Sequence, residues 1–413
     1  MPNLTLFVEL EAVRRNLIRL REIYGTGLLF MVKSNAYGHG IREVSVCAEP
    51  LVDYFGTATA EEGVILRRTG IKKPILVSVF KEKEAALLAK YSLTATLTGL
   101  SQAEALARGA GLSGKTADAH IKIDSGMNRL GVKSAKEFSD LARYAEASKS
   151  IRLCGCHTHI FDASDTGAVD KQLQFFHEIT DGTAEKYASS GREFIRHMSG
   201  SFPALTRQDL RFDMVRAGLA AYGGAVPHSE ESAAYEKIII GAGETKTKAG
   251  LAAYGGLEKS STEAGSNATN GGAVPECGES AHSVVTTFIP ALSAVAEVIA
   301  SKRGRAGENA GYGNNVLSRD TNIAIVSAGY GDGVSRRFAG GDVKIRGQRC
   351  RILGVPCMDV LLADTGGFLA SPGETAVVLD DELSAEYWAE LSGTVPYEIL
   401  CGFHNRVKYI YLS

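Results

Sequence analysis

Neither sign of charge predominates in this chain of 413 residues, which carries 45 Lys and Arg against 47 Asp and Glu. A net charge of -2 gives no basic surface for nucleic acid or for an anionic membrane. No apolar run approaches the ~18 residues of a membrane-spanning helix. Glu9 and Glu11 interrupt the amino-terminal stretch where a signal peptide needs its apolar core. We therefore expect a cytoplasmic protein that binds neither nucleic acid nor membrane.

Cysteine is also scarce, and the seven present are predicted to be free thiols. One cluster, Cys154-Gly155-Cys156-His157-Thr158-His159, has the composition of a metal site. In a strand, however, alternate residues face opposite sides, so the two cysteines face one way and the two histidines the other. Four ligands divided in this way cannot surround one zinc ion. We predict no metal here, but buried structural cysteines beside inward-facing histidines.

The first half of the chain alternates between two patterns. Between residues 27 and 218, apolar strand-like runs are separated by amphipathic helical stretches such as Ala135–Ala147. Eight such repeats predict an N-terminal (β/α)8 barrel of the TIM type over residues 11–225. The strand candidates are Leu28–Lys33, Tyr54–Ala58, Ile75–Val79, Thr94–Thr98, His120–Asp124, Cys154–His159, Ile195–Ser199 and Met214–Ala217.

Residues 226–283 differ in composition, being rich in Gly, Ser, Ala and Thr without clean periodicity. They contain a duplication, because Ala217–Gly224 recurs letter for letter as Ala249–Gly256. We interpret this segment as an exposed insertion that arose by local duplication. Only the first copy follows an arginine, Arg216, so function is assigned there.

From residue 284 onward, β-rich runs separated by Gly-rich turns predict a C-terminal, mainly-β domain over residues 284–413. Residues 1–10 are expected to supply a first strand to this domain. The candidates are Val284–Ile289, Ser293–Ala300, Asn322–Val326, Asp342–Ile345, Arg351–Val355, Val360–Ala363 and Val407–Leu412.

Lys33 ends an apolar run and is followed by small and polar residues, so it lies at the mouth of a buried strand. Apolar neighbours allow an amine to lose its proton and to form a Schiff base with a carbonyl. The run Met31-Val32-Lys33-Ser34-Asn35-Ala36-Tyr37-Gly38-His39-Gly40 resembles the pyridoxal-phosphate attachment motif of alanine racemases. The resemblance implies that Lys33 holds pyridoxal 5'-phosphate and that Tyr37 contacts its phosphate.

Inverting an amino acid at Cα is simplest with two bases on opposite faces of a planar intermediate. Lys33 is one candidate. The second is Tyr312, in Ala310-Gly311-Tyr312-Gly313-Asn314-Asn315, which resembles the racemase segment whose catalytic tyrosine comes from the partner subunit. The resemblance thus implies a homodimer, with Tyr312 and Met358 contributed across the interface. Because free phenol has a pKa of about 10, Tyr312 needs cationic neighbours to act near neutral pH.

His159 and Arg216 are the candidates for that cationic environment. His159 resembles the histidine that packs over the cofactor ring, and Arg216, in Asp213-Met214-Val215-Arg216-Ala217-Gly218-Leu219, the arginine that bonds the pyridine nitrogen. Because an arginine does not give up a proton, the ring nitrogen stays unprotonated, which favours return of the proton to Cα. In a decarboxylase of the same fold we would expect a carboxylate at this position, because it would keep the ring nitrogen protonated.

Lys122 and Arg129 form a further pair, in Lys122-Ile123-Asp124-Ser125-Gly126-Met127-Asn128-Arg129. Alternation points Lys122 and Asp124 into the barrel, where a lysine close to an arginine is costly. Some racemases carbamylate the equivalent lysine, so we expect a carbamylated Lys122 or, as the alternative, an acid such as Asp124 in its place. Arg129 is predicted to contact the cofactor phenolate and the substrate carboxylate.

The remaining predicted contacts follow the same resemblance. The cofactor phosphate is expected to meet Tyr37, Ser201, Gly218, Leu219 and Tyr397, and backbone amides near the last barrel strands suit a dianion. Met358, in Gly354-Val355-Pro356-Cys357-Met358-Asp359, is assigned to the substrate carboxylate. Tyr330 is assigned to the wall of the access channel.

Two departures from the family pattern concern the site: Gly200 stands where asparagine is usual, and Val355 where arginine is frequent. The predicted function is interconversion of L- and D-alanine, a small amino-acid substrate. Two alternatives stay open, namely a racemase for serine or another amino acid, and a non-catalytic pyridoxal-phosphate-binding protein derived from a racemase. A decarboxylase is disfavoured by Arg216.

Overall fold

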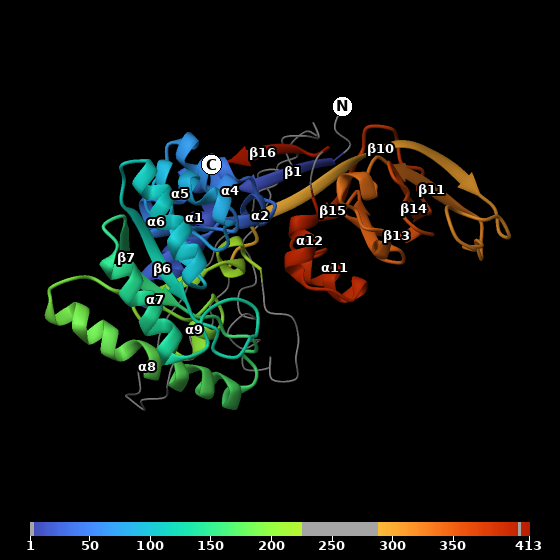
Figure 1. The fold of residues 1–413 in the computed structure, drawn as a ribbon. Helices are drawn as coiled ribbons and strands as arrows, with labels where there is room; N and C mark the ends of the chain where they lie inside the picture. Colours follow the sequence, from blue (N-terminus) through green and yellow to red (C-terminus); the bar gives the residue numbers. More distant parts are fainter. Residues whose placement is uncertain (1–3, 225–287, 404–405) are drawn as a thin grey trace, which may run out of the picture.

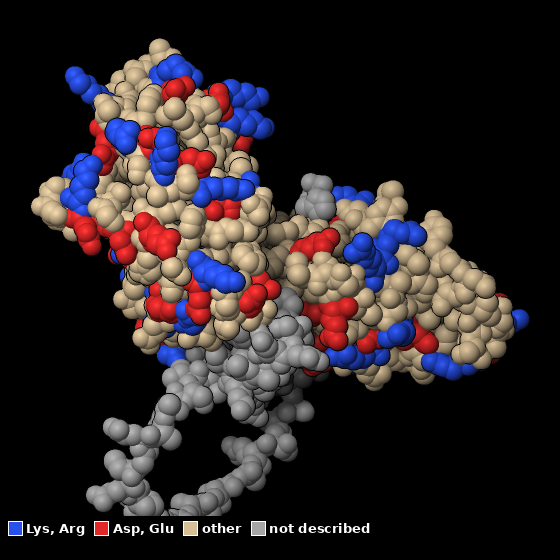
Figure 2. All heavy atoms as spheres, turned by 60° about the horizontal axis from the view of Figure 1, so that its bottom comes forward, with Lys and Arg blue, Asp and Glu red and all other residues tan. Residues whose placement is uncertain are grey.

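The computed structural model describes residues 4–224, 288–403 and 406–413, which form two lobes joined by long strands (Figure 1). The proposed insertion and most of the predicted strand Val284–Ile289 lie outside these residues. Phe288 and Ile289, the described end of that prediction, are not in a strand. No helix of the described ranges is long and apolar enough to cross a bilayer. On the face in Figure 2, Lys and Arg are interspersed with Asp and Glu over both lobes.

The first lobe is an eight-stranded parallel barrel, as predicted. The strands neighbour one another in the order β8-β7-β6-β5-β4-β3-β2-β9. The barrel is completed between its end strands, where Gly200 and Arg216 form a parallel bridge and Arg216 N donates to Ser199 O at 3.1 Å. The strands are β2 (Gly27–Met31), β3 (Tyr54–Thr57), β4 (Ile75–Val77), β5 (Thr94–Leu97), β6 (Ala117–Lys122), β7 (Ile151–His157), β8 (Ile195–His197) and β9 (Met214–Ala217).

Helices surround this barrel, and their boundaries follow local capping chemistry. The hydroxyl of Ser134 accepts from Glu137 N at the start of α7 (Ala135–Ala147), the range predicted from the sequence. Asp165 caps α8 (Thr166–Ser189), which buries Val169, Phe176 and Ile179 at helical spacing. The other described helices of this lobe are α1 (Leu10–Tyr24), α2 (Lys33–Tyr37), α3 (Ile41–Ala48), α4 (Ala60–Thr69), α5 (Ala85–Lys90), α6 (Leu100–Leu112) and α9 (Pro203–Thr206).

The second lobe is built on an eight-stranded sheet with the order β11-β14-β13-β12-β15-β10-β1-β16. All described pairings in it are antiparallel except that of β1 with β16. Its strands are β1 (Leu4–Glu9), β10 (Leu292–Gly304), β11 (Thr321–Val326), β12 (Asp342–Ile345), β13 (Gln348–Leu353), β14 (Leu361–Gly366), β15 (Thr375–Leu379) and β16 (Lys408–Leu412). The sheet confirms a C-terminal β domain.

Two helices of this lobe were not predicted from the sequence, α11 (Ala385–Ser392) and α12 (Pro396–Gly402). The fully buried Trp388 on α11 stacks on Phe338 at a ring-centroid distance of 4.0 Å. Its indole N–H donates to Val378 O on β15 at 2.8 Å, which satisfies its only polar atom. The helices thereby complete the core of this lobe, and α12 brings Tyr397 toward the barrel.

Candidate functional site

Lys33 lies immediately beyond β2, at the carboxyl end of the barrel strands. The four residues after it, Ser34–Tyr37, all have left-handed backbone angles with φ between 51° and 56°. Such a turn costs roughly 1–2 kcal/mol for each non-glycine residue, so surrounding contacts must hold it. Ser34 N donates to Glu62 Oε1 at 2.6 Å, and Ile41 N donates to Asn35 Oδ1 at 2.9 Å. The turn therefore presents Lys33 and Tyr37 from a fixed backbone.

Four basic side chains converge beside this turn, and they alter one another's protonation. Burial lowers the pKa of Lys33, and the positive charges of Arg129 and Arg216 lower it further. Burial likewise lowers the pKa of Lys122 to about 7, again with Arg216 and Arg129 contributing. Lys122 Nζ donates to Ile123 O at 3.2 Å. The cluster favours neutral amines on both lysines and suits an anionic ligand.

Asp124 does not neutralise Arg129 by an ion pair, as the alternative to carbamylation would require. Its carboxylate instead accepts the backbone N–H groups of Gly126, Asn128 and Arg129, at 3.1, 2.9 and 2.9 Å. Asp124 therefore shapes the loop that carries Arg129, and the Arg129 residue is exposed.

Arg216, on β9, is buried and is held almost entirely by acceptors. Its Nη1 donates to His197 Nδ1 and His197 O at 3.0 and 3.1 Å, while Nη2 donates to Met198 O and Thr158 O at 2.7 and 2.8 Å. Nη2 also lies 3.2 Å from His159 Nδ1. Burial lowers the pKa of Arg216 to about 10, so it remains protonated at neutral pH. Within the described ranges, the Nε–H group is left without a partner.

His159 is not cationic, contrary to one predicted role. Burial lowers its pKa to about 3, and the charges of Arg216 and Lys122 act in the same direction. Because Arg216 only donates, Nδ1 of His159 accepts and the imidazole proton lies on Nε2. The positive charge at this position comes from Arg216, whose Nη2 donates a hydrogen bond to His159.

Small polar groups cluster at the ends of β8 and β9. Gly218 N donates to Ser201 Oγ at 2.8 Å, and a Cβ at Gly218 would lie 2.9 Å from the Tyr37 hydroxyl. Only glycine leaves this hydroxyl accessible. Leu219 follows in the short helix η4 (Leu219–Tyr222), and the ring of Tyr397 lies 5.7 Å from that of Tyr37. Burial raises the pKa of both tyrosines, so they remain hydroxyl donors.

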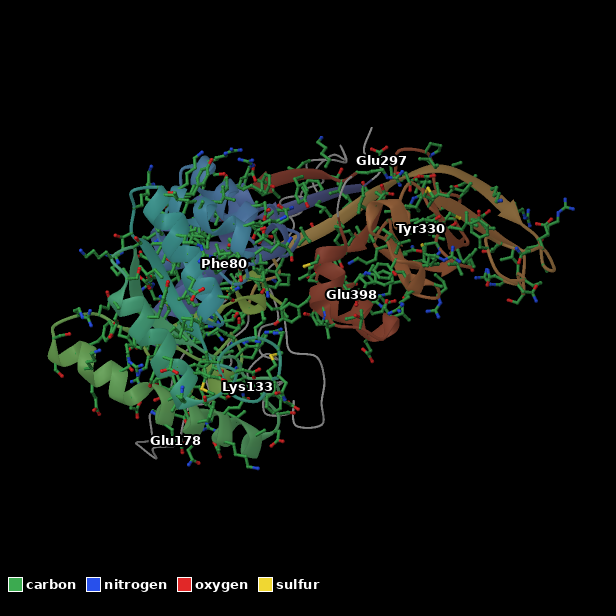
Figure 3. The ribbon with its side chains drawn as sticks, in the orientation of Figure 1. Phe80, Lys133, Glu178, Glu297, Tyr330 and Glu398 are labelled. Carbon is green, nitrogen blue, oxygen red and sulfur yellow. The ribbon has the colours of Figure 1, made fainter. Side chains whose placement is uncertain are left out.

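Tyr312, Met358 and Tyr330 are not part of this cluster in the single chain. Tyr312 lies in the connection between β10 and β11, two strands of the second lobe (Figure 1), and it is 60% exposed. Met358 is 52% exposed and Tyr330 38%; Figure 3 places Tyr330 on the second lobe, away from the barrel. Both family departures adjoin predicted site residues, since Gly200 bridges Arg216 and Val355 pairs with Tyr312.

Sequence reasoning missed two residues that position the predicted ones. Glu62 accepts from the backbone of Ser34 and of Ala58, and its place three residues after the helix cap Thr59 was the available signal. Arg406 joins the two loops that carry Tyr330 and Met358. It donates to Gly331 O, Met358 O and the Asp359 carboxylate at 3.2, 3.1 and 2.7 Å. No local motif marks it.

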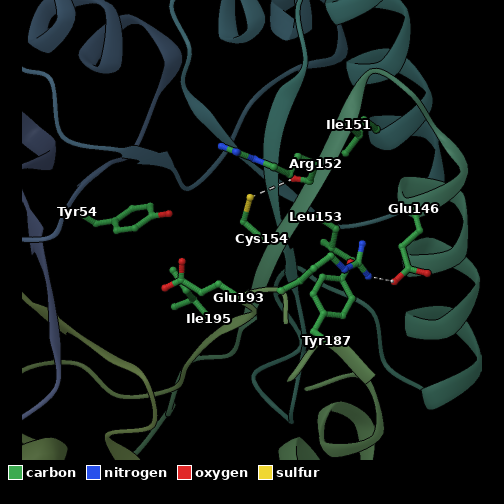
Figure 4. A pocket seen from close by; sticks show the side chains of 10 residues that line it. Tyr54, Glu146, Ile151, Arg152, Leu153, Cys154, Tyr187, Glu193 and Ile195 are labelled. Carbon is green, nitrogen blue, oxygen red and sulfur yellow. Dashed lines mark hydrogen bonds and ion pairs between the residues drawn. The ribbon is translucent and has the colours of Figure 1, made fainter. Parts of the chain in front are cut away.

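A cavity of about 420 Å³ lies elsewhere, at the amino ends of β7 and β8 (Figure 4). Its lining includes Tyr54, Cys154 and Glu193 but none of the predicted site residues. Burial raises the pKa of the Cys154 thiol to about 11, so the thiol is not an activated nucleophile. Barrels of this type place their chemistry at the opposite, carboxyl ends of the strands. We therefore take the cluster around Lys33 as the candidate functional site.

Comparisons with known proteins show the family of this chain. The family model described as alanine racemase, N-terminal domain matches residues 8–226, and the alanine racemase C-terminal domain model matches residues 291–411. The chain belongs to the alanine racemase family. The alanine racemase of Salinispora tropica is 30% identical over 420 residues, covering 98% of this chain and 97% of that protein. That of Mycobacterium tuberculosis H37Rv is 30% identical over 421 residues, covering 98% and 94%.

Solved alanine racemase structures share the whole architecture. The crystal structure of the enzyme from D-cycloserine-producing Streptomyces lavendulae matches with a TM-score of 0.81 at 28% identity, covering 100% of this chain and 98% of that one. The family resemblance and the barrel-plus-β fold predicted from the sequence are thus confirmed. The family models leave residues 227–290 unmatched, and all of the proposed insertion except its first residue lies within this gap.

Proposed function

We propose that this chain is a pyridoxal-phosphate-dependent racemase that interconverts L- and D-alanine, with Lys33 and Tyr312 as its two bases. One observation carries the proposal: a lysine with a lowered pKa lies at the barrel mouth beside an arginine whose Nε–H is free. The names of the relatives favour alanine over the other substrates left open by the sequence, and over a non-catalytic carrier.

The residues at the barrel mouth fit pyridoxal phosphate. A neutral lysine amine suits covalent attachment of an aldehyde. The hydroxyls of Tyr37 and Ser201 meet at Gly218, where an added Cβ would lie 2.9 and 4.0 Å from them, and with Leu219 and Tyr397 they would hold the phosphate. Arg216 Nε would bond the ring nitrogen, with His159 against the ring. When bound, the cofactor supplies the electron sink that acidifies the Cα–H bond.

The protein's own groups then account for proton movement. Lys33, whose pKa is lowered by burial and by two arginines, takes or returns the proton on one face. Tyr312 serves the other face. Arg129 would bind the cofactor phenolate and the substrate carboxylate, with the Met358 amide as a second carboxylate donor and Tyr330 as a wall. Because Arg216 keeps its proton at neutral pH, it does not protonate the ring nitrogen, which favours reprotonation at Cα.

Carbamylation of Lys122 is part of this proposal. A pKa near 7 leaves much of the Lys122 amine neutral at physiological pH, and a neutral amine is the form that adds carbon dioxide. The resulting anion would offset the charges of Arg129 and Arg216 in a cluster where Asp124 is engaged by backbone amides. Electron density at the Lys122 side chain, or loss of activity in Lys122→Ala restored by a short carboxylic acid, would test it.

A homodimer follows from the positions of Tyr312, Met358 and Tyr330. These exposed residues belong to segments between strands of the second lobe of their own chain, so we propose that they complete the barrel site of a partner subunit. Mixing Lys33→Ala and Tyr312→Phe chains tests this. Random exchange in a two-fold dimer makes half of the dimers mixed, each with one intact site, which restores about one quarter of wild-type activity. Demonstrated exchange without recovery would place both bases in one chain.

The proposed activity is tested by incubating the purified protein with each L-amino acid in heavy water and recording stereoinversion together with deuteration at Cα. Inversion and deuteration of alanine are expected. A preference for serine would support the first alternative, and no exchange with any amino acid despite bound cofactor would support the carrier. Lys33→Ala should abolish the visible absorbance of bound cofactor after dialysis, whereas Lys136→Ala, an exposed lysine on α7, should retain it.

A further inference from the structure

Three histidines lie inside the barrel, deeper than the residues assigned above. His120 on β6, His157 on β7 and His197 on β8 come from neighbouring strands, and the first and last are fully buried. The His157 and His197 rings stack at 4.7 Å with 10° between their planes. His120 Nδ1 lies 3.0 Å from His197 Nε2. This contact extends the interactions of Arg216 toward the barrel interior.

The direction of these hydrogen bonds follows from the arginine. A guanidinium group has only donors, so His197 Nδ1, 3.0 Å from Arg216 Nη1, must accept. A neutral imidazole that accepts at Nδ1 carries its proton on Nε2. His197 Nε2–H therefore donates to His120 Nδ1, and His120 must carry its own proton on Nε2. The protonation of each ring is fixed by the one before it.

The far end of this chain is unsatisfied within the described residues. His120 Nε2 is buried and has no hydrogen-bond partner there. Reversing the chain would give His120 a different proton position, but it would set an N–H of His197 against an N–H of Arg216 in a buried site. Leaving the neutral His120 Nε2–H without an acceptor costs less free energy than placing two N–H groups of Arg216 and His197 against each other. The need of Arg216 for an acceptor thus determines which nitrogen carries the proton in both His197 and His120.

We propose that His120 is a positioning residue for Arg216, acting through His197: its Nδ1 accepts the hydrogen bond from His197 Nε2–H and thereby holds the His197 ring with its Nδ1 acceptor facing the guanidinium. The consequence for the site rests on the proposed function, in which Arg216 Nε bonds the cofactor ring. With Nη1 and Nη2 both held by acceptors, the Nε–H group keeps a single direction. His120 reaches no ligand itself.

The test compares two substitutions of His120 in the cofactor-loaded dimer. His120→Asn can place Oδ1 where Nδ1 was, and so preserves the acceptor, whereas His120→Leu removes the acceptor but keeps the site filled. His157→Leu is the control, because it removes the stacked ring and leaves the His120 acceptor in place. Side-chain nitrogen chemical shifts of 15N-histidine-labelled protein report which nitrogen of His197 is protonated, and this readout does not require turnover.

We expect the His197 proton on Nε2 in the wild type and in all three variants, with the Nε2 chemical shift changed only in His120→Leu, where this N–H group has lost its acceptor. The loss of one buried hydrogen bond should lower kcat about fivefold in His120→Leu, with little change in KM, and His120→Asn should recover most of it. A wild-type proton on Nδ1, or an unaltered Nε2 chemical shift and rate in His120→Leu, would overturn the proposal. Should His120→Leu fail to fold, the wild-type spectrum and His120→Asn still decide it. Absence of racemisation in the wild type would refute the proposed function alone.

Discussion

His39 should make the protein sensitive to mild acid. The residue follows the left-handed turn after Lys33 and is fully buried, with its ring 4.6 Å from that of Tyr222. Its Nδ1–H donates to Tyr37 O at 2.9 Å, while Nε2 has no partner within the described residues. Burial lowers the pKa of His39 to about 4, against about 6.5 in an unfolded chain.

The sign of the effect follows from proton uptake. Below pH 6.5 the unfolded chain binds a proton at His39 and the folded protein does not, so acid favours unfolding. The stability present above pH 6.5 is lost as the pH falls toward 4. Between pH 8 and pH 5 the loss attributable to this residue is about 2 kcal/mol, and it reaches about 3.4 kcal/mol below pH 4.

The assay is guanidinium unfolding of wild type and His39→Leu at pH 8 and pH 5, at fixed protein and cofactor concentrations. The variant should lose about 2 kcal/mol less than the wild type on acidification. Because packing changes from the substitution are present at both pH values, they cancel in this comparison. Equal losses in the two proteins would show that His39 is protonated in the native state, and the reasoning from burial would fail.

Three further predictions concern the site and its supports. Gly38→Ala should lower the free energy of unfolding by about 3 kcal/mol, because φ is +83° and the new Cβ would lie 2.1 Å from Leu400 O. Gly25→Ala is the control, because Gly25 also has a positive φ but a Cβ there would meet nothing within 4 Å, and it should lower the free energy of unfolding by about 1 kcal/mol. Equal losses in the two variants would contradict the steric argument. Gly200→Asn should change thermal stability little, because a Cβ there meets only Arg216 O at 3.9 Å, and a large loss would show that the space beside Arg216 is needed. Arg406→Ala should raise KM for alanine severalfold with a smaller change in kcat, and Arg406→Lys should recover part of it; an unchanged KM would separate Arg406 from the substrate loops.

The sequence was sufficient for the elements whose patterns are local. The eight barrel strands are apolar runs between amphipathic helices, and each overlaps its predicted range, although β6 and β7 begin three residues earlier than predicted. The helix α11 was missed although Ser384 caps its start and Gly393, in a left-handed conformation, follows its end, so the local signal was present. The strand β15 was missed as well.

The support of the site was beyond such reasoning because its contacts join distant parts of the chain. Lys33, Tyr37, His159 and Arg216 were predicted because their segments resemble family motifs. The bond from Ser34 N to Glu62 spans 28 residues, and that between His120 and His197 spans 77. Arg406 reaches Gly331 across 75 residues. Such pairs depend on strand order and register, which the pattern of one segment does not specify.

The placement of β1 has a consequence for how the molecule assembles. Its neighbours on either side are β10 and β16, the latter in register from Thr5↔Lys408 to Glu9↔Leu412. During translation, β1 is therefore synthesised long before β10 and β16. Both of its edges stay unpaired until the whole barrel has been synthesised. Removing residues 408–412 would leave the β1 edge that pairs with β16 without a partner, and we expect the protein to self-associate through this edge.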